Sequence, residues 1–249
     1  MASAWADRLP VVSVPRAAAP KPVTFVYPFY QCHRFFAHQL EVWRAYPAEW
    51  RRHLTVIVAD DGSPTPAALP PVEARPCAMR LFRIDIDLPW NWLAARNIGA
   101  HYAPDGWLLL TDMDHVVPET TLRALVEGDH DPRVIYAFRR VEHTGAVVTP
   151  HSASFFLTRA LFWQIGGYDE ELSGRYGTDG DFRRRAFAVA PCLVLATPLV
   201  RHEYVEDSST TQYPRKRPED YTAVKRLVAQ REPGWRPRIL SFPYREILC

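Results

Sequence analysis

Two aspartates separated by one residue, Asp112 and Asp114, follow the apolar run Trp107–Thr111. Alternate residues of an extended chain point the same way, so both carboxylates can face one site. Carboxylate oxygens bind divalent cations, and a cation held there can neutralise the charge that builds on a departing diphosphate. The pair therefore predicts a metal site, although acids that follow a strand are also common on ordinary surfaces.

A second acidic pair, Asp60 and Asp61, lies between the apolar run Leu54–Ala59 and Gly62. A carboxylate here can accept hydrogen bonds from a ribose hydroxyl or a base N–H, and the glycine permits a sharp exit turn. An ordinary Asp-Gly-Ser turn explains the same residues. The residues alone leave both interpretations open.

A glycine-rich acidic stretch over residues 166–182 contains Asp179 and Asp181 at the start of a helical pattern. Acids at a helix N-terminus are good caps, which is one explanation of both aspartates. The density of glycine favours another, because glycines let the backbone approach a bound sugar closely. We therefore expect this stretch to lie beside a sugar.

His202 follows a short apolar run over residues 193–196. A lone histidine is usually structural or exposed, but an imidazole joined to carboxylates suits manganese as well as magnesium. His202 is therefore a candidate third ligand of the metal site. His115, which directly follows the Asp112–Asp114 pair, is expected to be a solvent-facing bystander rather than a phosphate contact.

The elements that must position these side chains alternate along the chain. Strand-like runs are expected near residues 23–27, 54–59, 79–84 and 107–111, with helices near 35–46 and 93–102. This alternation predicts a parallel, doubly wound sheet, in which ligands bind at the carboxyl ends of the strands. Beyond Pro118 the pattern is mixed, with strands expected near 134–140 and 152–157 and helices near 119–127, 159–165 and 220–230. We expect an α/β fold with one mixed, mostly parallel central sheet.

Length and composition limit the possibilities. A chain of 249 residues, 47% hydrophobic and 23% charged, suits one globular domain. The net charge of +2 gives no overall field that would attract nucleic acid or an anionic membrane. The four cysteines form no C-x-x-C pair, and no run approaches the roughly 18 apolar residues of a membrane span. We therefore expect a cytoplasmic protein with no transmembrane segment.

Three segments are expected along the chain. Residues 1–22 are an extended lead-in, residues 23–204 form the main domain, and residues 205–249 form a loop or lid, a helix and a tail packed on that domain. Proline and polar residues in the first and last segments favour this division.

Taken in order, these motifs resemble the GT-A glycosyltransferases, specifically family 2-like enzymes and the C-terminal half of the β-1,4-galactosyltransferase group. The resemblance covers about residues 23–204 and includes Ala95–Gly99 beside the acidic motifs. It implies a Rossmann-like GT-A fold and a metal-dependent, inverting hexosyltransferase. The implied cofactors are Mn²⁺ or Mg²⁺ and a nucleotide-sugar donor, expected to be a UDP-sugar.

The resemblance also implies roles for single residues. The nucleoside would be held by Pro28, Phe29 and Asp60 or Asp61, with Arg96 near the donor. The metal would be bound by Asp112, which also lies by the ribose, together with Asp114 and His202. Asp179 would deprotonate the acceptor hydroxyl, and the acceptor would be contacted by Tyr176, Gly177, Thr178 and Asp181.

Thr178 stands where the family usually has glutamate, and Tyr176 replaces a tryptophan common in the galactosyltransferase group. The acceptor therefore stays open: a saccharide, a small molecule, or a hydroxymethylated base of phage DNA. The last is suggested by basic and aromatic residues that alternate beyond Thr211, although a solvated helix face explains them as well. A degenerate sugar- or nucleotide-binding module is the non-enzymatic alternative.

Overall fold

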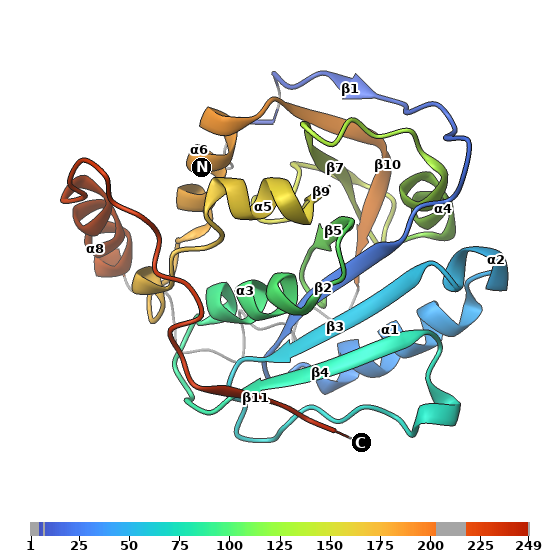
Figure 1. Ribbon diagram of the computed structural model, residues 1–249, viewed down its shortest axis with the longest axis horizontal. Coiled ribbons are helices and arrows are strands. Elements are labelled where there is room, and N and C mark those ends of the chain that lie inside the picture. The colour runs from blue at the N-terminus through green and yellow to red at the C-terminus, as the bar shows by residue number, and fades with distance from the viewer. Residues whose placement is uncertain (1–4, 7, 203–217, 249) are drawn as a thin grey trace.

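One mixed sheet organises the computed structural model, which describes residues 5–6, 8–202 and 218–248 (Figure 1). The strands run in the order β1-β10-β7-β9-β5-β2-β3-β4-β11, with β6 beside β10 and β8 beside β7. Their bounds are β1 Val11–Val12, β2 Val23–Phe29, β3 Leu54–Asp60, β4 Ala78–Ile84, β5 Trp107–Leu110, β6 His115–Val116, β7 Ile135–Glu142, β8 Val147–Val148, β9 Phe155–Thr158, β10 Cys192–Arg201 and β11 Tyr244–Glu246.

The sheet is parallel in its main blocks and antiparallel where β9 joins them. Strand β2 pairs in parallel with β3 and β5, β3 with β4, and β10 with β7. Strand β9 runs antiparallel between β5 and β7. The predicted α/β fold with a mixed, mostly parallel central sheet is confirmed.

Helices cover both faces of this sheet (Figure 1). One face packs against α1, α2 and α4, and the other against α3, α5 and α6. The helices are α1 His33–Ala45, α2 Ala48–Arg51, α3 Trp92–Tyr102, α4 Glu119–Glu127, α5 Arg159–Ile165, α6 Asp179–Val189 and α8 Pro218–Ala229, with 3₁₀ turns at Val72–Ala74 and Glu170–Leu172.

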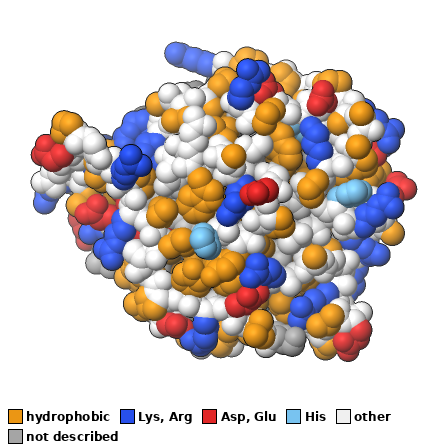
Figure 2. Space-filling model, in the orientation of Figure 1, with side chains coloured by type: hydrophobic (Ala, Val, Ile, Leu, Met, Phe, Trp, Pro, Cys, Tyr) orange, Lys and Arg blue, Asp and Glu red, His pale blue; other side chains and the backbone are white. Residues whose placement is uncertain are grey.

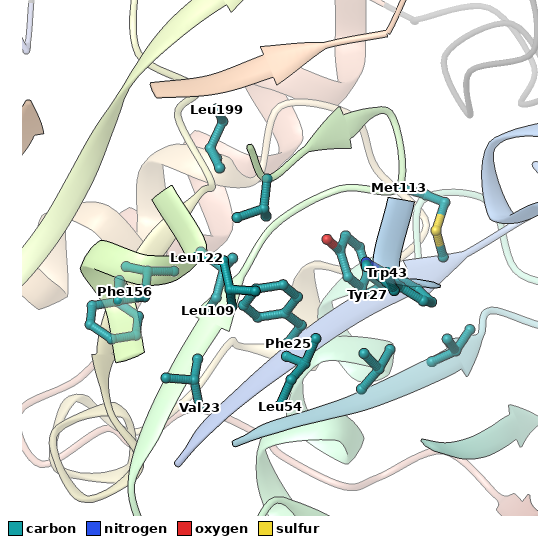
Figure 3. Close-up of a cluster of buried hydrophobic side chains, with 14 of the residues drawn as sticks. Val23, Phe25, Tyr27, Trp43, Leu54, Leu109, Met113, Leu122, Phe156 and Leu199 are labelled. Atoms are coloured by element: carbon teal, nitrogen blue, oxygen red, sulfur yellow. The ribbon is translucent and has the colours of Figure 1, made fainter. Parts of the chain in front are cut away.

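The alternation of side chains along β2 separates two hydrophobic cores. Phe25 and Tyr27 point into the core beneath α1, while Val26 points into the core beneath α3. Figure 3 shows the first core, where Trp43 of α1 packs beside Tyr27. Full burial of one such side chain contributes about 2 kcal/mol, so packing on both faces fixes the positions of the strand ends.

Several short strands were not predicted. Strand β1 lies in the expected lead-in and pairs with β10, and β11 pairs with β4. Strands of two or three residues are too short to show a period of two, so their sequences carry no signal. The C-terminal segment is nevertheless firmly attached, because the Glu170 carboxylate accepts hydrogen bonds from the backbone N–H groups of Leu240 and Ser241 at 2.8 and 2.7 Å.

Some basic residues of the C-terminal segment form ion pairs with acidic residues. Arg231 contacts Asp169 and Asp181 at 2.5 Å each, and Arg245 pairs with Asp85. On the face in Figure 2, basic, acidic and hydrophobic side chains are intermixed.

The segment 205–217, which was expected to form a loop or lid, lies outside the described residues. In the part of the chain that is described, no helix has the length and hydropathy needed to cross a bilayer.

The buried residue His130 generates a prediction about stability. Its side chain packs against the stacked rings of Trp107 and Phe156, and its Nδ1 lies 3.0 Å from the carbonyl oxygen of Gly128. Burial lowers the pKa of His130 from 6.5 to about 4. The unfolded chain therefore binds a proton first, and stability is lost as the pH falls from about 6.5 to about 4.

We expect this residue to contribute a loss of roughly 3 kcal/mol in the free energy of unfolding across that range. Chemical denaturation of wild type and His130→Gln between pH 7 and pH 4 measures it, because the variant lacks the titrating group. His143→Gln, an exposed histidine in a turn, is the control and should keep the wild-type pH dependence. Parallel pH profiles for wild type and His130→Gln would contradict the prediction.

Candidate active site

A cleft opens at the carboxyl ends of β2, β3 and β5. The loops after these three strands, the turn before β9 and the start of α6 bring polar groups to it. The cleft is lined by Pro28, Phe29, Tyr30, Cys32, Phe35, Asp61, Trp90, Trp92, Asp112, Met113, Asp114, His151, Ala153, Tyr176, Gly177 and Asp179.

Asp112 is held by a fully buried arginine from α3. The Arg96 Nη2 donates to Asp112 Oδ1 at 2.5 Å, and its Nη1 donates to the Tyr168 hydroxyl at 3.0 Å and to the carbonyl of Ala153. The guanidinium also stacks over Trp92, 4.7 Å from the ring centre. Arg96 was expected near the donor. Its hydrogen bonds are with protein groups and fix one oxygen of Asp112, and its place near the donor stays a prediction.

Met113 and His115, on either side of Asp114, are held by hydrogen bonds from α1, on the face of the sheet that this helix covers. Gln39 of α1 is buried, and its Nε2 donates to the carbonyl oxygens of Met113 and His115 at 3.0 and 2.8 Å. The Met113 side chain points into the core beneath α1 (Figure 3). The aspartates on either side of Met113 both line the cleft. The expected extended segment is instead a turn, in which the His115 N–H donates to the Asp112 carbonyl at 3.1 Å.

One group of side chains in the described residues could hold a cation: Asp112, His115 and His151, whose donor atoms all lie within 4.8 Å of one another. The His151 Nε2 lies 3.4 Å from Asp112 Oδ2. Burial lowers the pKa of His151 to about 4, so at neutral pH the ring is in the neutral form that binds metals. One carboxylate with two imidazoles is a donor set suited to manganese and other transition metals.

This group shares only Asp112 with the set predicted from the sequence. Asp114 lines the cleft, and its Oδ1 lies 2.9 Å from His115 Nδ1. Burial raises the pKa of Asp114, but His115, His151 and Arg201 outweigh it and hold that pKa well below the usual range. Asp114 therefore stays ionised at any ordinary pH.

His202 is joined to Asp114 through the backbone, since its N–H donates to the Asp114 carbonyl at 2.9 Å. Its ring packs against Phe35 and His38, with ring centres 5.4 and 4.2 Å away, and His202 is not among the residues that line the cleft.

The expectation that His115 faces solvent is wrong, because His115 is only 1% exposed. Strand β6, which pairs with β10, carries it inward.

Asp179, at the start of α6, faces the same cleft as Asp112 and Asp114. Its Oδ2 accepts a hydrogen bond from the Ser152 hydroxyl at 3.0 Å. Burial raises the pKa of Asp179, and the charge of Asp112 raises it further, against the opposing effects of Ser152 and Arg96. A carboxylate with a raised pKa inside a cleft is suited to accept a proton.

The two residues of the second acidic pair, Asp60 and Asp61, have different surroundings. Asp60 Oδ1 accepts from the Ser63 N–H at 2.8 Å, and Oδ2 accepts from the Ala67 N–H and from Arg83 at 2.9 and 3.2 Å. These bonds match the turn interpretation for Asp60. Asp61 lines the cleft, as do Pro28 and Phe29.

Of the four residues expected to contact the acceptor, two line the cleft and two do not. Tyr176 and Gly177 line the cleft, and Gly177 has φ +86°, where an added Cβ would meet the Tyr221 ring at 2.5 Å. Thr178 is buried and does not line the cleft. Asp181 lies away from it, because its carboxylate is bonded to Arg184, Arg185 and Arg231.

Sequence reasoning missed His151, Ser152 and Gln39 as parts of the site. None belongs to a motif. His151 lines the cleft, Ser152 bonds to Asp179, and Gln39 supports the residue between the aspartates from the α1 face of the sheet. A histidine before a predicted strand and two serines within it are a weak signal at best. Trp90, another cleft residue that was missed, has φ +58°, an uncommon backbone conformation for a residue other than glycine.

Comparison with known sequences gives a family match. Residues 29–190 match the model of the family described as glycosyl transferase family 2. The curated proteins contain no match to this chain.

Several solved glycosyltransferases share the fold. S. aureus TarS 1–349 in complex with UDP-GlcNAc superposes with a TM-score of 0.65 at 17% identity, over 84% of this chain and 65% of that one. The mannosyltransferase PcManGT from Pyrobaculum calidifontis, in complex with GDP-Man and Mn²⁺, gives 0.50 at 20% identity over 75% and 60%. GalNAc-T7 with UDP, GalNAc and Mn²⁺ gives 0.56 at 15% identity over 84% and 49%. The chain thus spans less than two thirds of the length of each.

The contact of fully buried Arg96 with Asp112, whose side chain is 34% exposed, generates a prediction about stability. Replacing Arg96 with leucine leaves the buried Tyr168 hydroxyl and Ala153 carbonyl without their donor, and we expect a loss of about 2–4 kcal/mol in the free energy of unfolding. The matched control is Arg80→Leu, which removes a two-bond pair with Glu246 that is about one third exposed. The control should lose about 1 kcal/mol or less. Equal losses in chemical denaturation would contradict the ranking.

Proposed function

The chain belongs to glycosyl transferase family 2, and from that membership we propose that it transfers a hexose from a nucleotide-sugar to an acceptor hydroxyl with Asp179 as the general base. A UDP-sugar is the proposed donor. The observation that carries the proposal is that Asp112, Asp114 and Asp179, which are far apart in sequence, line one cleft.

The donor side of the proposal comprises Pro28, Phe29 and Asp61 around the nucleoside. Asp112, His115 and His151 would hold a divalent cation, with Asp114 beside them. When bound, Mn²⁺ or Mg²⁺ supplies Lewis-acid stabilisation of the leaving diphosphate. TarS, PcManGT and GalNAc-T7 were solved with UDP-GlcNAc, GDP-Man and UDP respectively, which supports a nucleotide-linked donor here.

The acceptor side is Asp179 with Tyr176 and Gly177. In the proposed step, the acceptor oxygen forms a bond to the anomeric carbon while the bond from that carbon to the diphosphate oxygen breaks. The hydroxyl proton passes to the Asp179 carboxylate. Attack from the side opposite the leaving group inverts the anomeric configuration, and a raised pKa makes the carboxylate a better proton acceptor.

Removal of the base is expected to abolish turnover without abolishing donor binding. We expect Asp179→Asn to lower the rate of UDP release from UDP-sugars by about 10²–10⁴-fold. Thermal stabilisation by UDP with Mn²⁺ should remain near the wild-type value, because ligand binding to the folded state does not need the base. Full turnover in Asp179→Asn would refute its role.

The acidity of Asp179 sets an expected pH profile. Since only the ionised carboxylate accepts a proton, activity falls as the pH drops through its pKa in the folded protein. That pKa is raised by burial, so the acidic limb of the kcat/KM profile, which reports the free enzyme, should lie above the ordinary aspartate value of about 3.9. A limb at or below this value would contradict the assignment.

Cation binding can be tested apart from activity. Mn²⁺ should raise the melting temperature of the wild type in the presence of UDP, and EDTA should reverse the shift. We expect His151→Asn and Asp112→Asn to lose it. His101→Asn should retain it, because His101 is exposed in the last turn of α3, at the opposite end of that helix from the cleft residue Trp92. Retention of the shift in both cluster variants would remove these residues from the metal site.

A further inference from the structure

A four-residue turn just before β9, residues 151–154, contacts several parts of the cleft at once. The His151 Nδ1 lies 2.9 Å from Ser154 Oγ, which in turn lies 2.9 Å from Thr111 Oγ1, next to the Asp112–Asp114 pair. The Ala153 carbonyl accepts from Arg96. The turn is therefore joined to the residues around Asp112 at two points, Thr111 and Arg96.

The same turn reaches the opposite side of the cleft through Ser152. Its hydroxyl lies 3.0 Å from Asp179 Oδ2. A hydroxyl carries one proton and an ionised carboxylate only accepts, so Ser152 is the donor in this bond. Among the described residues, no hydrogen-bond donor is found for Asp179 Oδ1, and the Asp179 side chain lines the cleft.

We propose that Ser152 is a positioning residue that holds Oδ2 of Asp179 and thereby presents Oδ1 to the acceptor hydroxyl. The inference rests on the proposed function, in which Asp179 is the base. The turn then sets the spacing between the base and Asp112, because His151 and Ser152 are consecutive residues that hold one carboxylate each.

The charges around Asp179 bear on this role. Asp112 after β5, Arg96 of α3 and Arg183 of α6 all act on its carboxylate, and Tyr221 of α8 lies within range of its charge. Burial raises the pKa of Asp179, and the Ser152 hydrogen bond is the leading effect that opposes the rise. Loss of the hydroxyl would both free the carboxylate to rotate and leave less of it ionised.

The test uses Ser152→Ala with Ser152→Thr as the conservative variant, which keeps a hydroxyl. Ser241→Ala is the matched control, because the Ser241 hydroxyl also donates to a carboxylate, Glu170 Oε2 at 2.7 Å, away from the cleft. Activity is read as UDP release from UDP-sugars, with water or free monosaccharides as acceptors. The carboxylate of Asp179 is titrated separately by carbon-13 NMR.

We expect Ser152→Ala to lower kcat about tenfold, with the donor KM unchanged within about twofold, as loss of one hydrogen bond to a charged group predicts. The pKa of Asp179 should rise in the alanine variant. Ser152→Thr should recover most of the activity, and Ser241→Ala should match the wild type in both readouts.

Two results would overturn the proposal: an unchanged kcat together with an unchanged Asp179 pKa in Ser152→Ala, or a threonine variant as impaired as the alanine one. If the wild type turns over no nucleotide-sugar, the proposed function fails. The NMR titration then still decides whether Ser152 holds Asp179. A rise of the pKa in Ser152→Ala and not in Ser241→Ala would support the contact, and the absence of a rise would end it.

Discussion

The arrangement of the cleft depends on one buried positive charge. Arg96 is completely removed from solvent, and a guanidinium in that position is tolerated only when its N–H groups are bonded and its charge is balanced. Asp112, Tyr168 and Ala153 accept hydrogen bonds from the two Nη atoms, while the buried Nε has no hydrogen-bond partner among the described residues. Each of the three partners belongs to a different part of the chain. Because all three partners bond to Arg96, the end of β5, the turn before β9 and the segment before α6 are held close together.

A second constraint is the distribution of like charges. Asp112, Asp114 and Asp179 would repel one another if nothing opposed them, and the protein surrounds each with different partners. Asp114 lies among His115, His151 and Arg201, which favour its ionised form. Asp179 is half-buried at the cleft with fewer opposing groups, so its pKa is raised by the loss of solvent around it. Carboxylates of the same type are thereby given different chemical properties, which is the usual way in which one site separates binding from proton transfer.

The sequence predicted the central strands and helices well because their patterns are long. The runs at β3 and β5 are continuously apolar, and α3 and α4 fall within a residue or two of the expected ranges. Motifs led to Asp112, Asp114 and Asp179, which line one cleft, and their roles stay predictions. The site was not predicted at His151 and Ser152, because nothing local distinguishes a turn that contacts the cleft from one that faces solvent. Asp60 and Asp181 were assigned to ligands, but their bonding is to nearby backbone and arginine groups.

The strand β11 has a consequence for the behaviour of the protein in solution. It covers the outer edge of β4, a seven-residue strand, and it is held there by the Arg80–Glu246 contacts at 2.7 and 2.8 Å. Uncovered edges of this length act as templates for pairing with other chains and promote aggregation. Fusion partners or affinity tags that strain β11 would expose that template, so colloidal stability during purification depends on leaving this strand undisturbed.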